Sequence, residues 1–438
     1  MKVTVMSSKA VEPAYDSGGA PCLAAAAAVV PLTVFDKPRP TEPSSWGSPR
    51  PWRRTARGQG ASAWTPAGSG DRAILLNDAG ARLVEATADI ALGDLMPLEP
   101  TPELLALYPA AGAGAEELML VQVTRFACGS FAVGTTVQHL VADGTGARAF
   151  IVAWANATRG AAIDPVVPAR DRASIFAPCC PPRERGAKRN AGPSYGDELV
   201  VHRLRFDREF LAKLRSAASA GAAAPRLSYS AVLCVAAHLW RCITKARGLG
   251  AAEITTTLRI AVDGRRRMRH PRLPEGYTGN VVLWARPAAA AGELVSMPLG
   301  HAAALVSRAV SHVDDRYFRS FIGFASSAAV EAEGLAPAAD PARTARCPDV
   351  EVYSLVGAPL HDLDFGTGRP FLRTFGYMAE EGLVFTLSLR RRRHRRPGVP
   401  LPPRHGRLQG LLLHPANGRR AALGVPWSVR KRRVYLRL

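Results

Sequence analysis

A strand hairpin followed directly by a helix, within residues 119–154, is the feature that most constrains the fold of this chain. Residues 119–126 and 131–137 run apolar or alternate in the manner of strands, with a short Ala-Cys-Gly turn between them. The next segment has apolar side chains at helical spacing, which predicts one buried stripe of Ala147, Phe150, Ile151 and Trp154. Strands and helices that each bury one face must pack on one another, so we expect an α/β fold.

The second half of the sequence shows a similar mixture of elements. A helix should begin at Ser228 or Ser230 and bury Leu233, Ala236, Ala237 and Trp240. Further strands are predicted at 200–206, 254–262, 280–285, 350–356 and 383–387, with another helix at 301–311. Residues 178–193 are rich in Pro, Gly and basic side chains, as is typical of a connection between two halves. We therefore expect an N-terminal domain of residues 1–177, a crossover linker of 178–198 and a C-terminal domain of 199–389.

The net charge of +21 is concentrated in two segments. Residues 390–438 contain 15 Lys or Arg and no Asp or Glu, and residues 38–68 contain five Arg and one Glu. The rest of the chain is close to neutral, so its surface predicts no polyanionic partner such as a nucleic acid. Neither segment has apolar periodicity. We interpret them as a basic loop and a tail outside the fold, or as GC-rich coding sequence read in a shifted frame.

A tail that binds a polyanion is a third interpretation of residues 390–438. Sites of that kind usually interleave aromatic side chains with the basic ones, and this segment has only Trp427 and Tyr435. The pattern therefore favours the first two interpretations.

Cysteine usage and hydropathy indicate the compartment. The seven cysteines are an odd number with no CxxC pair, which argues against a disulfide framework or a zinc site. The apolar run at residues 20–32 is too short to span a bilayer, and it follows two acidic residues, unlike a signal peptide. We expect a cytoplasmic protein with no bound metal and no membrane partner.

His139 and Asp143 stand at the point where the hairpin gives way to the helix. If the second strand continued, His139 would share its apolar face, and a core histidine satisfied by backbone is the plain interpretation. However, small residues surround it, so that backbone can approach a ligand, and a neutral imidazole can accept a proton at neutral pH. Asp143 could orient that imidazole as in a triad, or it could pair with an arginine and hold the turn.

Five short runs occur in a fixed order along the chain: His139-x-x-x-Asp143-Gly144, Ala237-His238-x-Trp240-Arg241, Val262-Asp263-Gly264-Arg265, Gly276-Tyr277-x-Gly279-Asn280 and Asp364-Phe365-Gly366-x-Gly368. Together with the run from Pro31 to Asp36, they resemble the plant BAHD acyl-CoA-dependent acyltransferases. The resemblance covers about residues 9–37 and 70–388. Within that family the sequence is most similar to the hydroxycinnamoyltransferases of grasses.

The resemblance implies two chloramphenicol-acetyltransferase-like domains with a channel between them, in a monomer. Acyl-CoA would be a co-substrate, with no permanently bound cofactor. His139 would be the general base, while Asp143 and Gly144 would be structural and Asp143 would form a salt bridge with Arg265. The CoA side of the channel would be shaped by Asp364, Phe365, Gly366, Thr367 and Gly368. Ser354 and Leu355 would line the acceptor pocket, where relatives usually carry tryptophan at the second position.

Thr367 replaces a tryptophan that is commoner in this motif, and the variant resembles the branch that acylates amines such as agmatine and putrescine. No acyl-enzyme is needed if the acceptor attacks the thioester directly, so neither is a nucleophilic serine or cysteine. Esterification of shikimate or quinate is the alternative reaction. A catalytically degenerate relative is another, because residues 38–68 and 390–438 stand where the family has a helix-rich segment and further strands.

Overall fold

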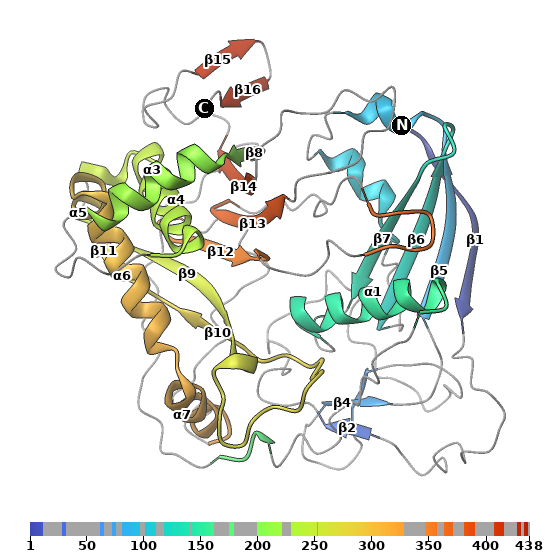
Figure 1. The fold of residues 1–438 in the computed structure, drawn as a ribbon, viewed down its shortest axis with the longest axis horizontal. Helices are drawn as coiled ribbons and strands as arrows, with labels where there is room; N and C mark the ends of the chain where they lie inside the picture. The colour runs from blue at the N-terminus through green and yellow to red at the C-terminus, as the bar shows by residue number, and fades with distance from the viewer. Residues whose placement is uncertain are drawn as a thin grey trace.

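A computed structural model gives the fold of the chain (Figure 1). The structure describes residues 1–11, 29–31, 62–64, 72–75, 81–96, 101–110, 118–137, 139, 142–161, 175–178, 199–220, 229–251, 253–327, 347–356, 363–370, 381–389, 407–415, 427–430 and 433–436. Helices and mixed sheets together confirm the α/β class.

The first half is built on a four-stranded sheet of order β1-β5-β6-β7. Its strands are β1 (Val3–Val11), β5 (Ala81–Ala88), β6 (Met119–Phe126) and β7 (Phe131–Val137). The predicted hairpin β6–β7 is confirmed at both ends, and Gly129 has the positive φ of 78° that its turn requires. The short helices η1 (Leu92–Leu95) and η2 (Pro102–Leu107) follow β5, and η2 closes over β7 so tightly that a Cβ on Gly134 would meet the Leu107 carbonyl oxygen at 2.1 Å.

Helix α1 (Gly144–Thr158) follows this hairpin, as predicted. The predicted buried stripe is wrong, because Phe150 is 44% exposed, Ala147, Ile151 and Trp154 are only half-buried, and the buried residues of α1 are Gly146 and Ala155. The helix contacts different partners at its two ends, Thr278 near the start and Phe365 near the finish. Among the described residues, the two ends of α1 therefore pack against different parts of the second half.

The second half contains a seven-stranded mixed sheet with the main order β10-β9-β12-β13-β14-β8, and β11 adds to β9. Its strands are β8 (Leu199–Phe206), β9 (Thr255–Asp263), β10 (Val282–Ala285), β11 (Ala288–Ala290), β12 (Val350–Ser354), β13 (Leu383–Leu389) and β14 (Arg407–Pro415). Strand β12 runs parallel to both β9 and β13, and the other neighbouring pairs of this sheet are antiparallel. The predicted strands of this half are confirmed to within two residues at each end.

The helices of the second half gather on the left of Figure 1, away from the four-stranded sheet. They are α3 (Arg208–Ser219), α4 (Ala231–Ala246), α5 (Ala291–Ser296), α6 (Leu299–His312) and α7 (Asp315–Ala325), with the short turns η3 (Leu249–Ala251) and η4 (Gly264–Arg266). Of the two serines considered as the N-cap of α4, it is Ser230 that accepts a hydrogen bond from Leu233 N–H. The fully buried Trp240 joins α4 to the sheet through a 3.1 Å hydrogen bond from its Nε1 to the Thr256 hydroxyl.

Strand β14 departs from the sequence prediction. Residues 390–438 were expected to lie outside the fold, but Arg407–Pro415 pairs with β13 on one side and β8 on the other. The sequence of this strand contains four leucines, and a short apolar run inside an Arg-rich segment is easily masked by its surroundings. The tail also contains the two-stranded pair β15 (Trp427–Arg430) and β16 (Arg433–Leu436).

The other unusual segment, residues 38–68, contributes β3 (Ser62–Trp64) to a three-stranded sheet with β2 (Val29–Pro31) and β4 (Arg72–Leu75). The remainder of that segment and residues 179–198 of the predicted linker lie outside the described residues. The proposed domain boundaries therefore stay predictions. Among the residues that the structure describes, no helix has the length and apolar character needed to cross a membrane.

Candidate active site

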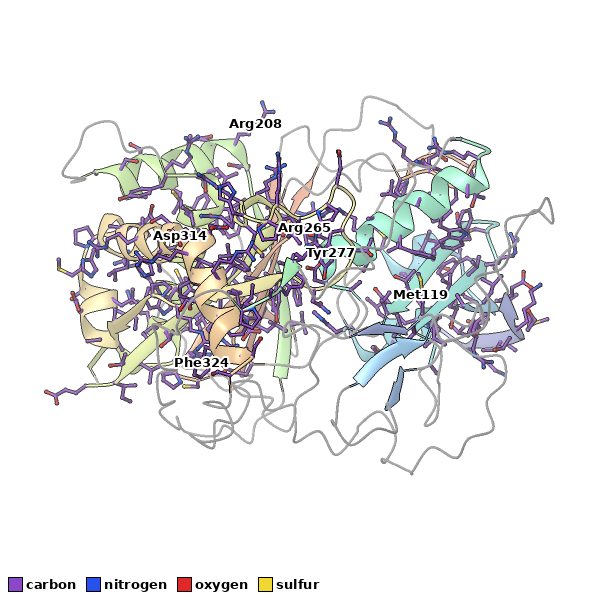
Figure 2. The ribbon with its side chains drawn as sticks, turned by 90° about the horizontal axis from the view of Figure 1, so that it is seen from below. Met119, Arg208, Arg265, Tyr277, Asp314 and Phe324 are labelled. Atoms are coloured by element: carbon purple, nitrogen blue, oxygen red, sulfur yellow. The ribbon has the colours of Figure 1, made fainter. Side chains whose placement is uncertain are left out.

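The candidate site forms at the edge of the large sheet where β9 and β12 end. These strands are parallel, so their carboxyl ends lie on one edge, a usual place for a ligand site in an α/β sheet. Gly264 and Arg265 follow β9 there, and Leu355 follows β12. Viewed from below, Arg265 and Tyr277 lie where the second half meets α1 (Figure 2).

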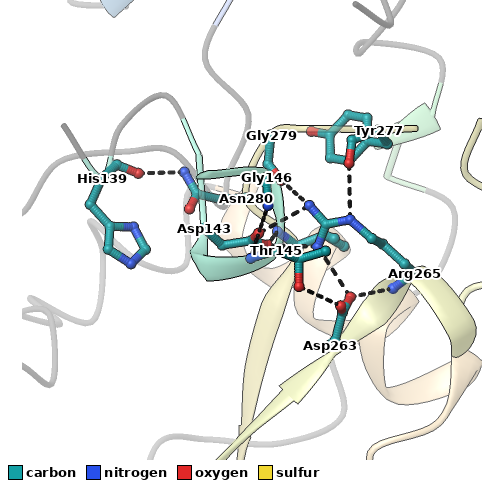
Figure 3. A network of polar contacts seen from close by, with 10 residues as sticks. His139, Asp143, Thr145, Gly146, Asp263, Arg265, Tyr277, Gly279 and Asn280 are labelled. Carbon is teal, nitrogen blue, oxygen red and sulfur yellow. Dashed lines mark hydrogen bonds and ion pairs between the residues drawn. The ribbon is translucent and has the colours of Figure 1, made fainter. Parts of the chain in front are cut away.

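Asp143 is buried at the start of α1 and accepts five hydrogen bonds. Its Oδ1 accepts from the N–H groups of Thr145 and Gly146, both at 3.0 Å, and so caps the helix. The second half supplies the other three donors, which are Val281 N–H and two nitrogens of Arg265 (Figure 3). The carboxylate is thus engaged by backbone and by an arginine, which favours the scaffold interpretation over the triad.

Arg265 is the matching side of this contact. Its two terminal nitrogens reach the Asp143 carboxylate oxygens at 2.8 and 3.0 Å, the paired geometry that a guanidinium fork favours. It also donates to the carbonyl oxygens of Tyr277 and Gly279, so the loop before β10 is fixed to the same group. Burial works to lower the pKa of Arg265, but the hydrogen bond and charge of Asp143 outweigh it and raise that pKa.

Two further residues complete this contact between the halves. Asp263 Oδ1 accepts two hydrogen bonds from Arg265, one from the Arg265 backbone N–H at 2.8 Å and one from Arg265 Nη1 at 3.2 Å. Its other carboxylate oxygen accepts from the Thr145 hydroxyl at 3.1 Å. The approach is close because Gly146 has no side chain; a Cβ there would lie 1.9 Å from the Thr278 carbonyl oxygen. We call Asp143, Thr145, Asp263 and Arg265 the interdomain latch.

His139 lies just outside the latch. Strand β7 ends at Val137, and His139 is exposed in the turn that follows, which excludes the interpretation as a core histidine. Its backbone carbonyl accepts a hydrogen bond from Asn280 Nδ2 at 2.6 Å, so the backbone, and not the imidazole, joins the network in Figure 3. The ring therefore remains outside these contacts, at the junction of the two halves.

The Asp364 turn contacts the other end of α1. Asp364 Oδ1 accepts from the N–H groups of Gly366 and Gly368, both at 2.9 Å, and these glycines have φ of 95° and 100°. Phe365 packs edge-on against Trp154 with ring centroids 4.7 Å apart. Thr367 is exposed. The turn belongs to the second half by sequence, yet it is seated on the helix of the first.

Of the two residues predicted for the acceptor pocket, Leu355 lies near the start of α1, and Ser354 precedes it at the end of β12. A Cβ built on Gly144, the first residue of α1, would be 3.8 Å from Leu355 Cδ2, so the Leu355 side chain lies close to the start of that helix. Ser354, the last residue of β12, is half-buried and accepts a hydrogen bond from Val356 N–H at 3.4 Å. The structure thus brings Leu355 to the start of α1, five residues after His139 in the sequence.

An aromatic cluster surrounds Tyr353 of β12, two residues before Leu355 in the sequence. Tyr353 stacks on Phe385 and meets Trp284 edge-on, in both cases with ring centroids 5.3 Å apart. Below it, a buried ion pair joins Arg259 to Glu351 at 2.8 Å, and Glu351 also accepts from the Tyr353 hydroxyl. Arg259 also lies over the Trp284 ring, 4.7 Å from its centroid, so these aromatic side chains pack against one another and against the ion pair.

Comparison with known proteins identifies the family. The family model described as "Transferase family" matches residues 65–394, three quarters of the chain. The chain belongs to the BAHD acyltransferase family. It is 49% identical over 427 residues to agmatine hydroxycinnamoyltransferase 1 of Oryza sativa subsp. japonica, covering 88% of this chain and 92% of that protein. It is 50% identical over 421 residues to agmatine coumaroyltransferase-1 of Hordeum vulgare, covering 88% and 93%.

Solved structures agree on the architecture of this BAHD protein. Vinorine synthase superposes with a TM-score of 0.63 at 17% identity, over 95% of this chain and 96% of its own. TRI101 of F. sporotrichioides, solved in complex with coenzyme A and T-2, superposes with a TM-score of 0.61 at 18% identity, over 82% and 83%. These similarities confirm the two-domain acyltransferase fold that the motifs predicted.

Sequence reasoning missed two parts of the BAHD site. Thr145 and Asp263 were not predicted to form a contact, although Asp263 was inside a quoted motif, and Asn280 had no assigned role. The signal available was the Asp263-Gly264-Arg265 run, where a carboxylate so close to an arginine suggests a shared polar network. Within the described residues, no group of three or more His, Cys, Asp or Glu side chains gathers in a way that could hold a metal ion.

Proposed function

We propose that this protein is an acyl-CoA-dependent acyltransferase that moves a hydroxycinnamoyl group from a CoA thioester to an amine such as agmatine or putrescine. The observation that carries the proposal is about 50% identity, over most of both chains, to plant transferases named for agmatine. A putrescine hydroxycinnamoyltransferase of Oryza sativa subsp. japonica is 40% identical, which supports the same class of acceptor.

His139 is the proposed general base. Its exposed imidazole stands at the junction of the halves, where an acceptor and a thioester from opposite sides could meet. The imidazole accepts a proton from the amine nitrogen as that nitrogen attacks the thioester carbonyl carbon. The tetrahedral intermediate then collapses, the C–S bond breaks, and the imidazolium returns a proton to the CoA thiolate. The amide and free CoA are the products, without an acyl-enzyme.

Leu355 is proposed to line the acceptor pocket. Its aliphatic side chain lies 3.8 Å from where a Cβ on Gly144 would lie, at the start of α1 and five residues after His139 in the sequence. The Asp364 turn, seated on α1, is the proposed wall of the CoA side.

The proposal is tested with the purified full chain and p-coumaroyl-CoA. Agmatine, putrescine and shikimate are supplied in parallel, and product is followed by mass spectrometry while free CoA is followed with a thiol reagent. We expect amide from the amines in preference to ester from shikimate. Preferred ester formation would favour the shikimate alternative, and no product from any acceptor would favour the degenerate relative.

The role of His139 is tested by His139→Ala, which should lower kcat by about 10³-fold or more. The variant loses both the proton transfer by a positioned base and the part of the rate gain that comes from orienting the acceptor. His312→Ala is the matched control, since His312 is also exposed but lies at the end of α6, away from the latch. Equal rates for His139→Ala and the unmodified protein would remove the base assignment while leaving the family membership intact.

A further inference from the structure

Asn280 is a buried amide that reaches from the second half to the backbone of the proposed base. It is 3% exposed, and its Nδ2 donates to the His139 carbonyl oxygen at 2.6 Å across 141 positions of sequence. This is the hydrogen bond in Figure 3 that connects His139 to the network around the latch. The contact therefore links the position of the base to the other half of the protein.

The segment that carries Asn280 is itself held in place on both sides. The Gly279 carbonyl oxygen before it accepts from Arg265 at 2.7 Å, and the Val281 N–H after it donates to Asp143 at 3.1 Å. Three consecutive residues thus contact the latch or His139. Because its neighbours are fixed by the buried ion pair, the Asn280 amide has little freedom to follow the His139 backbone if that backbone moves.

His139 needs such a support because it lies beyond its own strand. The β7 ladder ends at Val137, paired with Met119, so the regular hydrogen bonds of the sheet stop two residues earlier. Helix α1 begins only at Gly144, after the Asp143 cap. Between these two anchors, the Asn280 hydrogen bond holds the His139 carbonyl and thereby the direction in which the side chain leaves the backbone.

We propose that Asn280 is a positioning residue for the acyl transfer, an inference that rests on the proposed role of His139. It touches neither substrate; it acts by holding the His139 backbone so that the imidazole meets the acceptor nitrogen in the reactive geometry. A displacement of about 1 Å in a reacting group can cost on the order of 100-fold in rate. Loss of the amide should therefore lower kcat and kcat/KM together, with KM for acyl-CoA nearly unchanged.

The first experiment compares Asn280→Leu and Asn280→Ala with Gln122→Leu. Gln122 is a matched control because it is also 3% exposed and donates its side-chain amide to a backbone carbonyl, that of Ala106 at 2.8 Å, inside the first half. Rates are corrected for the folded fraction from thermal melting. The expected result is a roughly 10- to 100-fold fall in kcat for the Asn280 variants and less than about 3-fold for the control. Equal corrected losses in the two sites would overturn the inference.

A second experiment separates positioning from a general structural role. Asn280→Ala is combined with His139→Ala, and residual amide formation is measured with radiolabelled acyl-CoA. If Asn280 acts through His139, its loss should cost nothing further once the imidazole is absent, because residues that act as a unit are not additive. The same factor in both backgrounds would contradict the inference. If His139→Ala alone leaves the rate unchanged, the proposed base fails first and Asn280 loses its role with it.

Discussion

Replacing Asp143 by Asn should destabilise the protein more than it changes the chemistry of the folded form. The substitution keeps the shape of the side chain but removes its charge and turns one acceptor oxygen into a donor. Both oxygens of Asp143 are surrounded by donors. Oδ1 accepts from Thr145 N–H, Gly146 N–H and Arg265 Nη2, and Oδ2 accepts from Val281 N–H and Arg265 Nη1. The new amide group would therefore meet N–H groups in either orientation.

The magnitude follows from burial. The side chains of Asp143 and Arg265 are 3% and 15% exposed, so the pair is mostly removed from water. Breaking a buried ion pair by removing one partner costs about 3–5 kcal/mol. Asp263 remains 3.2 Å from Arg265 and keeps part of the compensation, so the lower end of that range, about 3 kcal/mol, is expected. Domains of this kind have a margin of roughly 5–15 kcal/mol, so the variant should fold but unfold at lower urea concentration.

The assay is urea unfolding followed by fluorescence, together with kcat corrected for the folded fraction. His139→Ala, in an exposed turn, serves as the opposite case, with kcat lost and the midpoint retained. The double variant Asp143→Asn with Arg265→Gln should cost less than the sum of the single changes, because the second change removes the uncompensated charge. An Asp143→Asn variant with an unchanged urea midpoint and a kcat as low as that of His139→Ala would refute the scaffold role and restore the triad.

Three smaller predictions concern other sites. Burial lowers the pKa of His238 to about 4, so below pH 6.5 the unfolded chain binds a proton at this residue that the folded chain does not. Between pH 7 and pH 5 the unmodified protein should therefore lose roughly 2 kcal/mol more stability than His238→Leu, and the same change in urea midpoint for both proteins would contradict this. The Ser130 hydroxyl lowers the pKa of exposed Cys128 to about 7, so iodoacetamide at pH 7.5 should label it before buried Cys234, and Ser130→Ala should slow the labelling; peptide mass spectrometry decides the order. Leu355→Trp places an indole near the start of α1 and should raise KM for agmatine about 10-fold or more, while KM for acyl-CoA stays within about 3-fold. Unchanged agmatine kinetics would remove Leu355 from the proposed acceptor pocket.

Local patterns predicted the elements of this fold well. The hairpin β6–β7 and the helix capped by Ser230 depend on residues within one or two turns of each other, and both were found where the sequence placed them. The strand Arg407–Pro415 was missed because pairing on both sides, and not an alternating pattern of its own, defines it. Tertiary pairing can override a weak local preference in this way.

The site was harder to predict because its contacts are not local. The Asp143–Arg265 pair spans 122 positions and the Thr145–Asp263 hydrogen bond spans 118, so no spacing rule indicates them. The family resemblance supplied the ion pair with Arg265, but nothing in the residues alone chose it over the triad. The donors that surround the Asp143 carboxylate in the structure add a physical reason against the triad.

The contacts of α1 give a physical reason why motifs spread along the chain bear on the proposed base, His139. The latch fixes the start of α1 to the second half, and Phe365 of the Asp364 turn packs on Trp154 near its end. Trp240 contributes at the opposite end of β9, where its Nε1 donates a hydrogen bond to the Thr256 hydroxyl. Thr256 in turn donates to the Pro348 carbonyl oxygen just before β12. That chain of contacts sets β9 and β12 relative to each other, and with them the edge from which Arg265 and Leu355 project. Each motif therefore bears on where His139 stands, although none of the contacts reaches its imidazole.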